Sequence, residues 1–439
     1  MAIHRGLLSS LRWRTRITLW TAAVLAGLVV VSFAKLAELA LHAFTLLAQG
    51  RPWVTFILTP AIGMTAVWCT RRYFSGIQGS GIPQVIAATK LVSQGGEISK
   101  LVSIRIAIGK IVVGAFALLG GFSAGREGPS VQVAASIMHA SHRLLPHSRA
   151  LRPADLILAG GAAGVAAAFN TPLAGIVFAI EELGRRLETR TSGVLISTII
   201  LSGLVSIALL GNYNYFGQFS VLPQSASIIM PVLAGGVLCG LLGGAFSWLM
   251  LWPQKAKDFP LWVWRRNHPV RFAGICGLLV AVIGWAGDGL SFGTGYEVTK
   301  QAASGALELP WHASITRFLA TIVSYYSGIP GGIFAPSLAV GGALGATLSP
   351  LLPDAGGTAP FMALCMAGFL AAVTQSPITA AIIVMEMIDG HEMVIGLMAV
   401  SFIANVVSSR LSPELYQHLA LDWMPAHREW HASAPDKPD

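Results

Sequence analysis

Glu127 is the residue of this chain whose surroundings point most directly to chemistry. It lies in Gly125-Arg126-Glu127-Gly128-Pro129, a glycine-rich turn with proline near the first position of a following helix. Such a helix start presents free backbone N–H groups and the positive end of the helix dipole. An ionised carboxylate and a diffusing anion would compete for these donors. We expect Glu127 to occupy the site when ionised and to withdraw when protonated; the alternative is a helix-capping acid at a surface turn.

Two further strings have the same form. They are Gly79-Ser80-Gly81-Ile82-Pro83 and Gly331-Gly332-Ile333-Phe334-Ala335-Pro336. One anion-binding helix start is common in proteins, but three in one apolar chain suggest half-helices that meet around an anion inside a bilayer. This pattern predicts both the negative charge of the substrate and its position near the membrane centre.

The elements that position these turns belong to a polytopic α-helical membrane protein. Of the 439 residues, 54% are hydrophobic and only 11% are charged, and the mean hydropathy is +0.66. Several apolar stretches are shorter than the ~20 residues that a full crossing needs. Short segments rich in glycine and proline are typical of re-entrant or broken helices that neighbouring protein shields from lipid.

The net charge of +9 could suggest nucleic acid as a partner. The arginines fall instead in short clusters at the ends of apolar runs, as the positive-inside rule predicts for cytoplasmic loops. These clusters are Arg12, Arg14 and Arg16; Arg71 and Arg72; Arg185, Arg186 and Arg190; and Arg265, Arg266 and Arg271. We therefore expect a lipid bilayer rather than nucleic acid around the chain. We expect this bilayer to be a bacterial inner membrane, with both termini of the chain in the cytoplasm. No small-residue cleavage site follows the first apolar run, so we expect that run to be a retained helix and not a signal peptide.

Neither a cofactor nor an enzymatic site is expected. Cys69, Cys239, Cys276 and Cys365 stand singly in apolar surroundings without CxxC spacing, so no disulfide or metal site is implied. The sequence shows no nucleotide-binding loop or metal-ligand cluster. An intramembrane enzyme would need an HExxH motif, suitably placed membrane aspartates or a serine/histidine pair, none of which we identify.

The chain also repeats itself. Pro172 and Glu181 recur as Pro377 and Glu386 after 205 residues, and Pro129 recurs as Pro336 after 207. This near-constant offset predicts two homologous halves, roughly residues 15–210 and 225–420, in a single transmembrane domain with the substrate between them. Similar composition is the alternative, because small residues favour close helix packing in any membrane protein. Residues 421–439 are expected to form a cytoplasmic tail with a disordered end.

These strings, in this order, resemble one family, the CLC chloride channels and chloride/proton antiporters. The resemblance runs from the Gly79 turn to Tyr416, and is strongest to a short prokaryotic member without CBS domains. It implies an all-α fold of roughly eighteen tilted helical segments in two inverted halves, with broken helices. It also implies a homodimer with one pathway per subunit, whose interface we expect at Gly390–Val407 and Leu173–Ile180.

The resemblance assigns the chloride-binding donors to the hydroxyls of Ser80 and Tyr416 and the backbone N–H groups of Ile333 and Phe334. Such donors hold a weakly hydrated anion and release it readily. Alternatively, the serine could bond a helix backbone and the tyrosine could anchor a membrane edge. Glu127 corresponds to the gating glutamate. The remaining residues of the selectivity strings are Gly79, Gly81, Ile82, Pro83, Gly125, Arg126, Gly128, Pro129, Gly332, Ala335 and Pro336.

Glu182 separates an exchanger from a channel. It stands where the apolar run Leu173–Ile180 meets a basic loop, which predicts a place at the cytoplasmic mouth of the pathway. The resemblance implies that a glutamate here is the internal proton acceptor of the antiporters, with Glu181 as its paired acid, whereas channels carry an apolar residue. The alternative is a helix-end acid paired with Arg185 or Arg186.

Three residues after the Gly79 string depart from the family pattern or lack its usual partner. Gln84 and Ile86 stand where the family commonly has glutamates, and Lys110 resembles a lysine that usually pairs with one of those acids. A passive chloride channel of the same fold is the first alternative. Fluoride exporters of the family depart from the Gly79–Pro83 and Gly125–Pro129 strings, and this chain keeps both. Nitrate preference in the family goes with proline at the Ser80 position, so the serine favours chloride. We therefore predict a secondary active transporter that exchanges chloride for protons.

Overall fold

The computed structural model describes residues 2–145, 151–184, 192–211, 216, 228–352 and 357–424, with side chains from residue 13 onward except 192 and 194. Eighteen α-helices make up most of this part of the chain, and its only strand-like pairings are two isolated β-bridges. The basic cluster of Arg185, Arg186 and Arg190, the Arg12 side chain and the tail after residue 424 lie outside the described residues.

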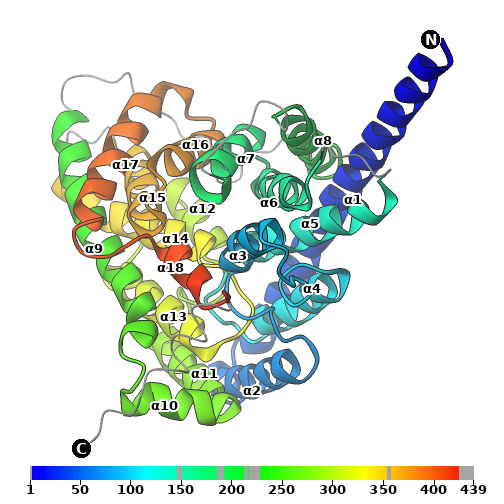
Figure 1. Cartoon of the computed structure of the whole chain (residues 1–439). Helices are drawn as coiled ribbons and strands as arrows, with labels where there is room; N and C mark the ends of the chain where they lie inside the picture. Colours follow the sequence, from blue (N-terminus) through cyan, green and yellow to red (C-terminus); the bar gives the residue numbers. More distant parts are fainter. Residues whose placement is uncertain are drawn as a thin grey trace, which may run out of the picture.

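The helices are numbered in chain order. The first eight are α1 (Ala2–Ala48), α2 (Thr55–Tyr73), α3 (Ile82–Ser93), α4 (Ile104–Leu119), α5 (Glu127–Ser141), α6 (Pro153–Phe169), α7 (Pro172–Phe178) and α8 (Ser192–Leu210). The other ten are α9 (Ile229–Lys255), α10 (Pro260–Asn267), α11 (Pro269–Ala286), α12 (Tyr296–Ala303), α13 (Ala313–Ser327), α14 (Phe334–Leu348), α15 (Thr358–Thr374), α16 (Pro377–Ile388), α17 (Val394–Ser408) and α18 (Leu415–Leu421). In Figure 1, α4, α5, α6 and α8 gather on one side, α9, α15 and α17 gather on the other, and α3, α14 and α18 lie between them.

Six helical segments of the described chain are long and apolar enough to cross a membrane. They are Trp13–Ala48, Pro52–Tyr73, Ile229–Lys255, Pro269–Ala286, Phe334–Leu351 and His391–Ser408. Other apolar helices, such as Pro377–Ile388, have only 10–17 residues. The predicted class, an all-α polytopic membrane protein with helices too short to span, is confirmed.

Helix boundaries recur with the offset seen in the sequence. α5 and α14 each have 15 residues and begin 207 positions apart. α6 and α15 each have 17 residues and begin 205 positions apart. α6 and α15 are each followed by a residue in the left-handed conformation, Asn170 (φ 59°) and Gln375 (φ 58°). α5 packs against α6 as α14 packs against α15, so equivalent sequence produces equivalent local structure.

Two glutamates join the short helices α7 and α16 reciprocally. Glu386, in α16, accepts hydrogen bonds from the first turn of α7, and Glu181, which follows α7, accepts them from the first turn of α16. The donors are the N–H groups of Leu173 (3.1 Å) and Ala174 (2.7 Å) for Glu386, and of Ile378 (3.2 Å) and Thr379 (2.7 Å) for Glu181. A carboxylate satisfies free helix-start donors and complements the helix dipole, so each helix stabilises the start of the other.

Candidate functional site

The three glycine-rich turns meet at one place. Gly125 and Gly332 exchange two backbone hydrogen bonds of 2.7 Å each. In chain order the first turn is that of Gly79, the second that of Gly125 and the third that of Gly331. The third turn also pairs with the first: Gly79 N–H donates to Ile329 O and Gly331 N–H donates to Gly79 O, both at 3.0 Å. The third turn therefore lies between the other two and fixes their relative positions.

This pairing brings the first residues of α3, α5 and α14 to one junction. Their N-terminal N–H groups are among the donors that a helix leaves without an internal acceptor. Within the described chain, the N–H groups of Ile333 and Phe334 donate to no backbone or side-chain acceptor. An anion at this junction would meet free donors and positive helix ends together.

The hydroxyls of Ser80 and Tyr416 face one another beside the junction. Both side chains are buried, and neither hydroxyl makes a well-formed hydrogen bond to a described residue, although the two lie within interacting range. A Cβ added to Gly128 would lie 2.3 Å from Ser80 Oγ, so only glycine allows the hydroxyl to approach the start of α5. Buried polar groups need partners, and an anion beside these hydroxyls would supply one.

An aromatic cluster holds Tyr416 and the start of α14 together. The rings of Phe334 and Tyr416 stack with their centroids 6.0 Å apart and 8° between their planes. Phe169 and Phe178 pack against Phe334 with centroids at 5.9 and 6.1 Å. Residues from α6, α7, α14 and α18 thus fix the position of Tyr416, whose side chain is fully buried within the protein.

Glu127 occupies the same junction. Its side chain is only 1% exposed, which excludes a capping acid at a surface turn. One carboxylate oxygen lies 2.3 Å from the position that a Cβ on Gly125 would take, and this position is also 3.4 Å from the Ala335 Cβ. The carboxylate therefore folds back over its own turn toward the start of α14, within electrostatic range of Tyr416.

Arg126 is held away from the junction. Its guanidinium donates to Ala34 O at 2.7 Å and to the Glu38 carboxylate at 2.9 Å, both on α1. This residue anchors the turn to α1, and its charge is paired with an acid. Sequence reasoning missed Glu38, whose signal is a single acid, three residues after Lys35, inside a long apolar run.

Glu182 is a buried carboxylate. It belongs to a π-helical segment, Ala179–Gly184, and is 3% exposed. One of its carboxylate oxygens accepts the Ser376 hydroxyl at 2.5 Å. Its backbone carbonyl accepts the Gln417 amide at 3.1 Å, and Gln417 in turn accepts Lys90 Nζ at 3.0 Å. The carboxylate also lies within electrostatic range of Tyr416. Ser376 escaped the sequence analysis because it is 194 residues away.

Lys110 and Gln84 both donate hydrogen bonds to the chain segment just before Ser80. Lys110 is buried, and its ammonium donates to Ile77 O and Gly79 O at 2.7 Å each. The Gln84 amide donates to Gln78 O at 2.6 Å. These donors satisfy carbonyls of the segment that leads into Ser80, so backbone dipoles take the place of the carboxylates that the family commonly has there.

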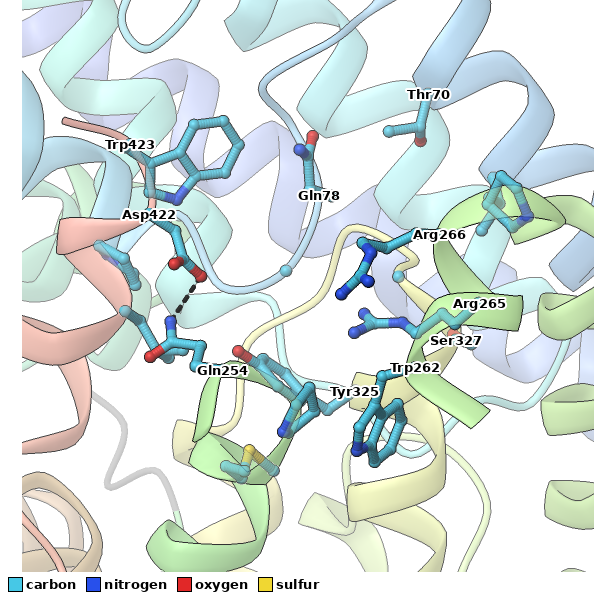
Figure 2. Close-up of a pocket in the computed structure, with 18 of the residues that line it drawn as sticks. Thr70, Gln78, Gln254, Trp262, Arg265, Arg266, Tyr325, Ser327, Asp422 and Trp423 are labelled. Atoms are coloured by element: carbon cyan, nitrogen blue, oxygen red, sulfur yellow. Dashed lines mark hydrogen bonds between the residues drawn. The ribbon is translucent and has the colours of Figure 1, made fainter. Parts of the chain in front are cut away.

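A cavity of about 810 Å³ leads to the junction from one side. Its inner end is lined by Gly79, Ser80 and Pro83, and its walls come from α2, α9, α10, α13 and the segment around α18. Figure 2 shows Arg265 and Arg266 pointing into this space from α10, with Tyr325 beside them and Asp422 and Trp423 across from them. We call this cavity the vestibule.

Comparison with known proteins identifies the family. Residues 62–409 match the model of the family described as voltage gated chloride channel. The chain is 30% identical over 418 residues to the H(+)/Cl(-) exchange transporter ClcA of Salmonella typhimurium strain LT2, covering 86% of this chain and 82% of that protein. It is 31% identical over 409 residues to ClcA of Klebsiella pneumoniae strain 342, covering 84% and 80%.

Solved structures share the fold. A slow cyanobacterial Cl-/H+ antiporter superposes with a TM-score of 0.79 at 22% identity, over 96% of this chain and 99% of that one. A CLC-type fluoride/proton antiporter superposes with a TM-score of 0.75 at 23% identity, over 93% and 98%. With the family model matched over most of its length, this chain belongs to the voltage-gated chloride channel (CLC) family.

Proposed function

We propose that this protein is a secondary active transporter that exchanges chloride for protons across a membrane. One observation carries the proposal. The free N–H groups of Ile333 and Phe334, the buried hydroxyls of Ser80 and Tyr416, and the Glu127 carboxylate all converge on the junction of three helix starts. This arrangement supplies neutral donors for an anion and an ionisable group that competes for the same place.

Chloride binds at this junction through four donors. Backbone N–H groups and hydroxyls bind a weakly hydrated monovalent anion without a full positive charge, so release stays fast enough for transport. Ionised Glu127 occupies the helix-start donors in place of chloride. Protonation removes the negative charge, the side chain withdraws, and the anion passes. The charge of Arg126 takes no part, because it is paired with Glu38.

Protons reach Glu127 from Glu182. Glu182 is buried and accepts the Ser376 hydroxyl. Burial of a carboxylate is costly even when it is hydrogen-bonded, and a passive anion pore would gain nothing from it. Tyr416 lies within electrostatic range of both acids. Curated relatives of this chain are named H(+)/Cl(-) exchange transporters, which favours exchange over the passive channel and gives no support to an enzyme.

The assembly follows the same reasoning. The two halves, roughly residues 15–210 and 225–420, are inverted repeats of one transmembrane domain, as the recurring helix boundaries and reciprocal glutamate caps support.

The protein is a homodimer, and its interface is formed by α7, α8, α16 and α17, which leave apolar side chains exposed. These include Leu173, Ile378, Ile395, Phe402 and Val406, and Ile180 in the π-helical segment after α7 is also exposed. The vestibule opens to the cytoplasm of a bacterial inner membrane, because Arg71, Arg265 and Arg266 line it.

A flux measurement tests this function. Purified protein is reconstituted into liposomes, and chloride and proton movements are recorded together under a chloride gradient. We expect chloride efflux to drive protons uphill in the opposite direction, without nucleotide or metal. Chloride flux with no proton counterflow, at every pH from mildly acidic to neutral, would leave the passive channel as the function.

A further inference from the structure

The vestibule gathers more positive than negative charge. Four basic residues line it, namely Arg71, Lys257, Arg265 and Arg266, against two acids, Asp258 and Asp422. These six charged residues come from three separate stretches of the chain, at residue 71, at residues 257–266 and at residue 422, so the fold rather than the sequence brings them together. Figure 2 shows the guanidinium groups of Arg265 and Arg266 side by side and directed into the open space.

Among the described residues, the arginines of the vestibule form no ion pair with an acid. The ion pairs of the described residues include none of Arg71, Arg265 and Arg266. Arg266 donates to a carbonyl, Lys257 O, at 2.7 Å, and Asp422 accepts the Gln254 amide at 2.5 Å. Arg71 and Arg265 lie close enough to repel each other. Like charges that converge in a concave space are stabilised by an anion between them.

Arg265 is the centre of this group. It is half-buried, and its guanidinium lies 6.0 Å from the centroid of the Phe272 ring. One terminal nitrogen lies 4.0 Å from the position that a Cβ on Gly328 would take, at the C-terminal end of α13. The negative end of that helix and the aromatic face hold the cation in place, while the fork of the guanidinium stays directed toward the cavity.

We propose that the vestibule contains a second anion site, centred on Arg265 and completed by Arg71 and Arg266, which binds small inorganic anions before they reach Ser80. The inference rests on the proposed transport function. Chloride arriving from solution is its ordinary occupant, and a divalent oxyanion such as sulfate binds it more tightly because its charge is larger and the guanidinium fork matches its oxygens. Asp258 and Asp422 in the same cavity disfavour an extended polyanion that would fill the whole space.

The first test compares chloride dependence in three proteins. They are the wild type, Arg265→Gln and Arg72→Gln; Arg72 is exposed and does not line the vestibule. At low ionic strength we expect Arg265→Gln to raise the apparent KM for chloride by about three- to tenfold. The reason is that a positively charged cleft raises the chloride concentration near the pathway, and the variant loses part of that charge. The maximal rate and the proton-to-chloride ratio stay unchanged. The effect shrinks when an impermeant salt raises the ionic strength, and Arg72→Gln behaves as the wild type.

The second test uses sulfate as the probe. Sulfate on both sides of the vesicles should inhibit wild-type chloride exchange competitively and should inhibit Arg265→Gln several-fold less. Arg266→Gln, at an exposed position, provides an independent variant with the same expected direction should Arg265→Gln not fold. Equal chloride KM and equal sulfate inhibition in wild type and folded variants would overturn the second site. A wild type without coupled exchange would instead overturn the proposed function, so the two failures are distinguishable.

Discussion

Ser376 and Thr171 occupy equivalent N-cap positions, 205 residues apart, at the starts of α16 and α7, yet only Ser376 meets a carboxylate. Its hydroxyl donates to Glu182 at 2.5 Å. The Thr171 hydroxyl is buried and has no hydrogen-bond partner among the described residues. The residue 205 positions after Glu182 is Met387. The capping pair Glu181 and Glu386 is therefore common to both halves, whereas Glu182 is present in one half alone.

Removing the Ser376 hydroxyl should weaken proton coupling. A hydrogen bond to a charged group contributes about 1.5–3 kcal/mol, so Ser376→Ala leaves Glu182 less well held, and we expect the proton-to-chloride ratio to fall while chloride flux continues. Ser376→Thr keeps a hydroxyl and should restore the ratio. Thr171→Val, at the equivalent position, is the control and should couple normally. A ratio unchanged in Ser376→Ala would show that the hydroxyl has no part in proton transfer.

Glu182→Gln should abolish proton movement and leave chloride flux. The amide fills the same space and cannot ionise, so no proton is taken up there. Simultaneous recording with chloride and pH electrodes in liposomes checks this. Retained uphill proton movement in the variant would contradict the role of Glu182 as the proton acceptor.

Glu127→Gln should also stop proton coupling, for a different reason. The amide resembles the protonated, withdrawn side chain, so the anion path stays open and chloride flux loses most of its pH dependence. Glu297→Gln is the matched control, because Glu297 also lies in the first turn of a helix but is exposed. A chloride flux in Glu127→Gln that keeps the wild-type pH profile would argue against competition between this carboxylate and chloride.

The reciprocal caps should affect stability rather than coupling. Glu181→Gln and Glu386→Gln each weaken two charge-assisted hydrogen bonds at a helix start, which we expect to cost about 1 kcal/mol each. Thermal unfolding in detergent should show similar losses for the two variants, and proton coupling should persist in both. Loss of coupling in Glu181→Gln alone would indicate that this residue also participates in proton transfer.

Lys110→Met should weaken chloride binding through the backbone. The carbonyls of Ile77 and Gly79 would lose their ammonium donor. Gly79 O keeps the Gly331 N–H, whereas the buried Ile77 O would be left unsatisfied, at a cost of about 1–3 kcal/mol. The turn that carries Ser80 would loosen, and calorimetric titration with chloride should give a weaker affinity. Lys300→Met, at an exposed lysine, serves as the control. An unchanged affinity would mean that the turn does not depend on Lys110.

The sequence by itself predicted the features that are local. Glycine and proline strings such as Gly125–Pro129 set where helices begin, because they fix backbone dihedrals and leave N–H groups free. The 205-residue offset predicted equivalent helix ends, and α6 and α15 have them. Apolar run lengths predicted the membrane class. Each of these signals is contained in a few consecutive residues.

The tertiary structure decided which distant groups meet. The partner of Glu182 is 194 residues away, and Arg126 turns to Glu38 on α1, 88 residues earlier. Lys110 bonds backbone carbonyls where the sequence lacks the acids that commonly pair with such a lysine, and the vestibule arginines converge from α2 and α10. Such contacts depend on how helices cross and pack, and each buried polar group takes whatever partner the packing brings within about 3 Å. No short stretch of sequence contains that information.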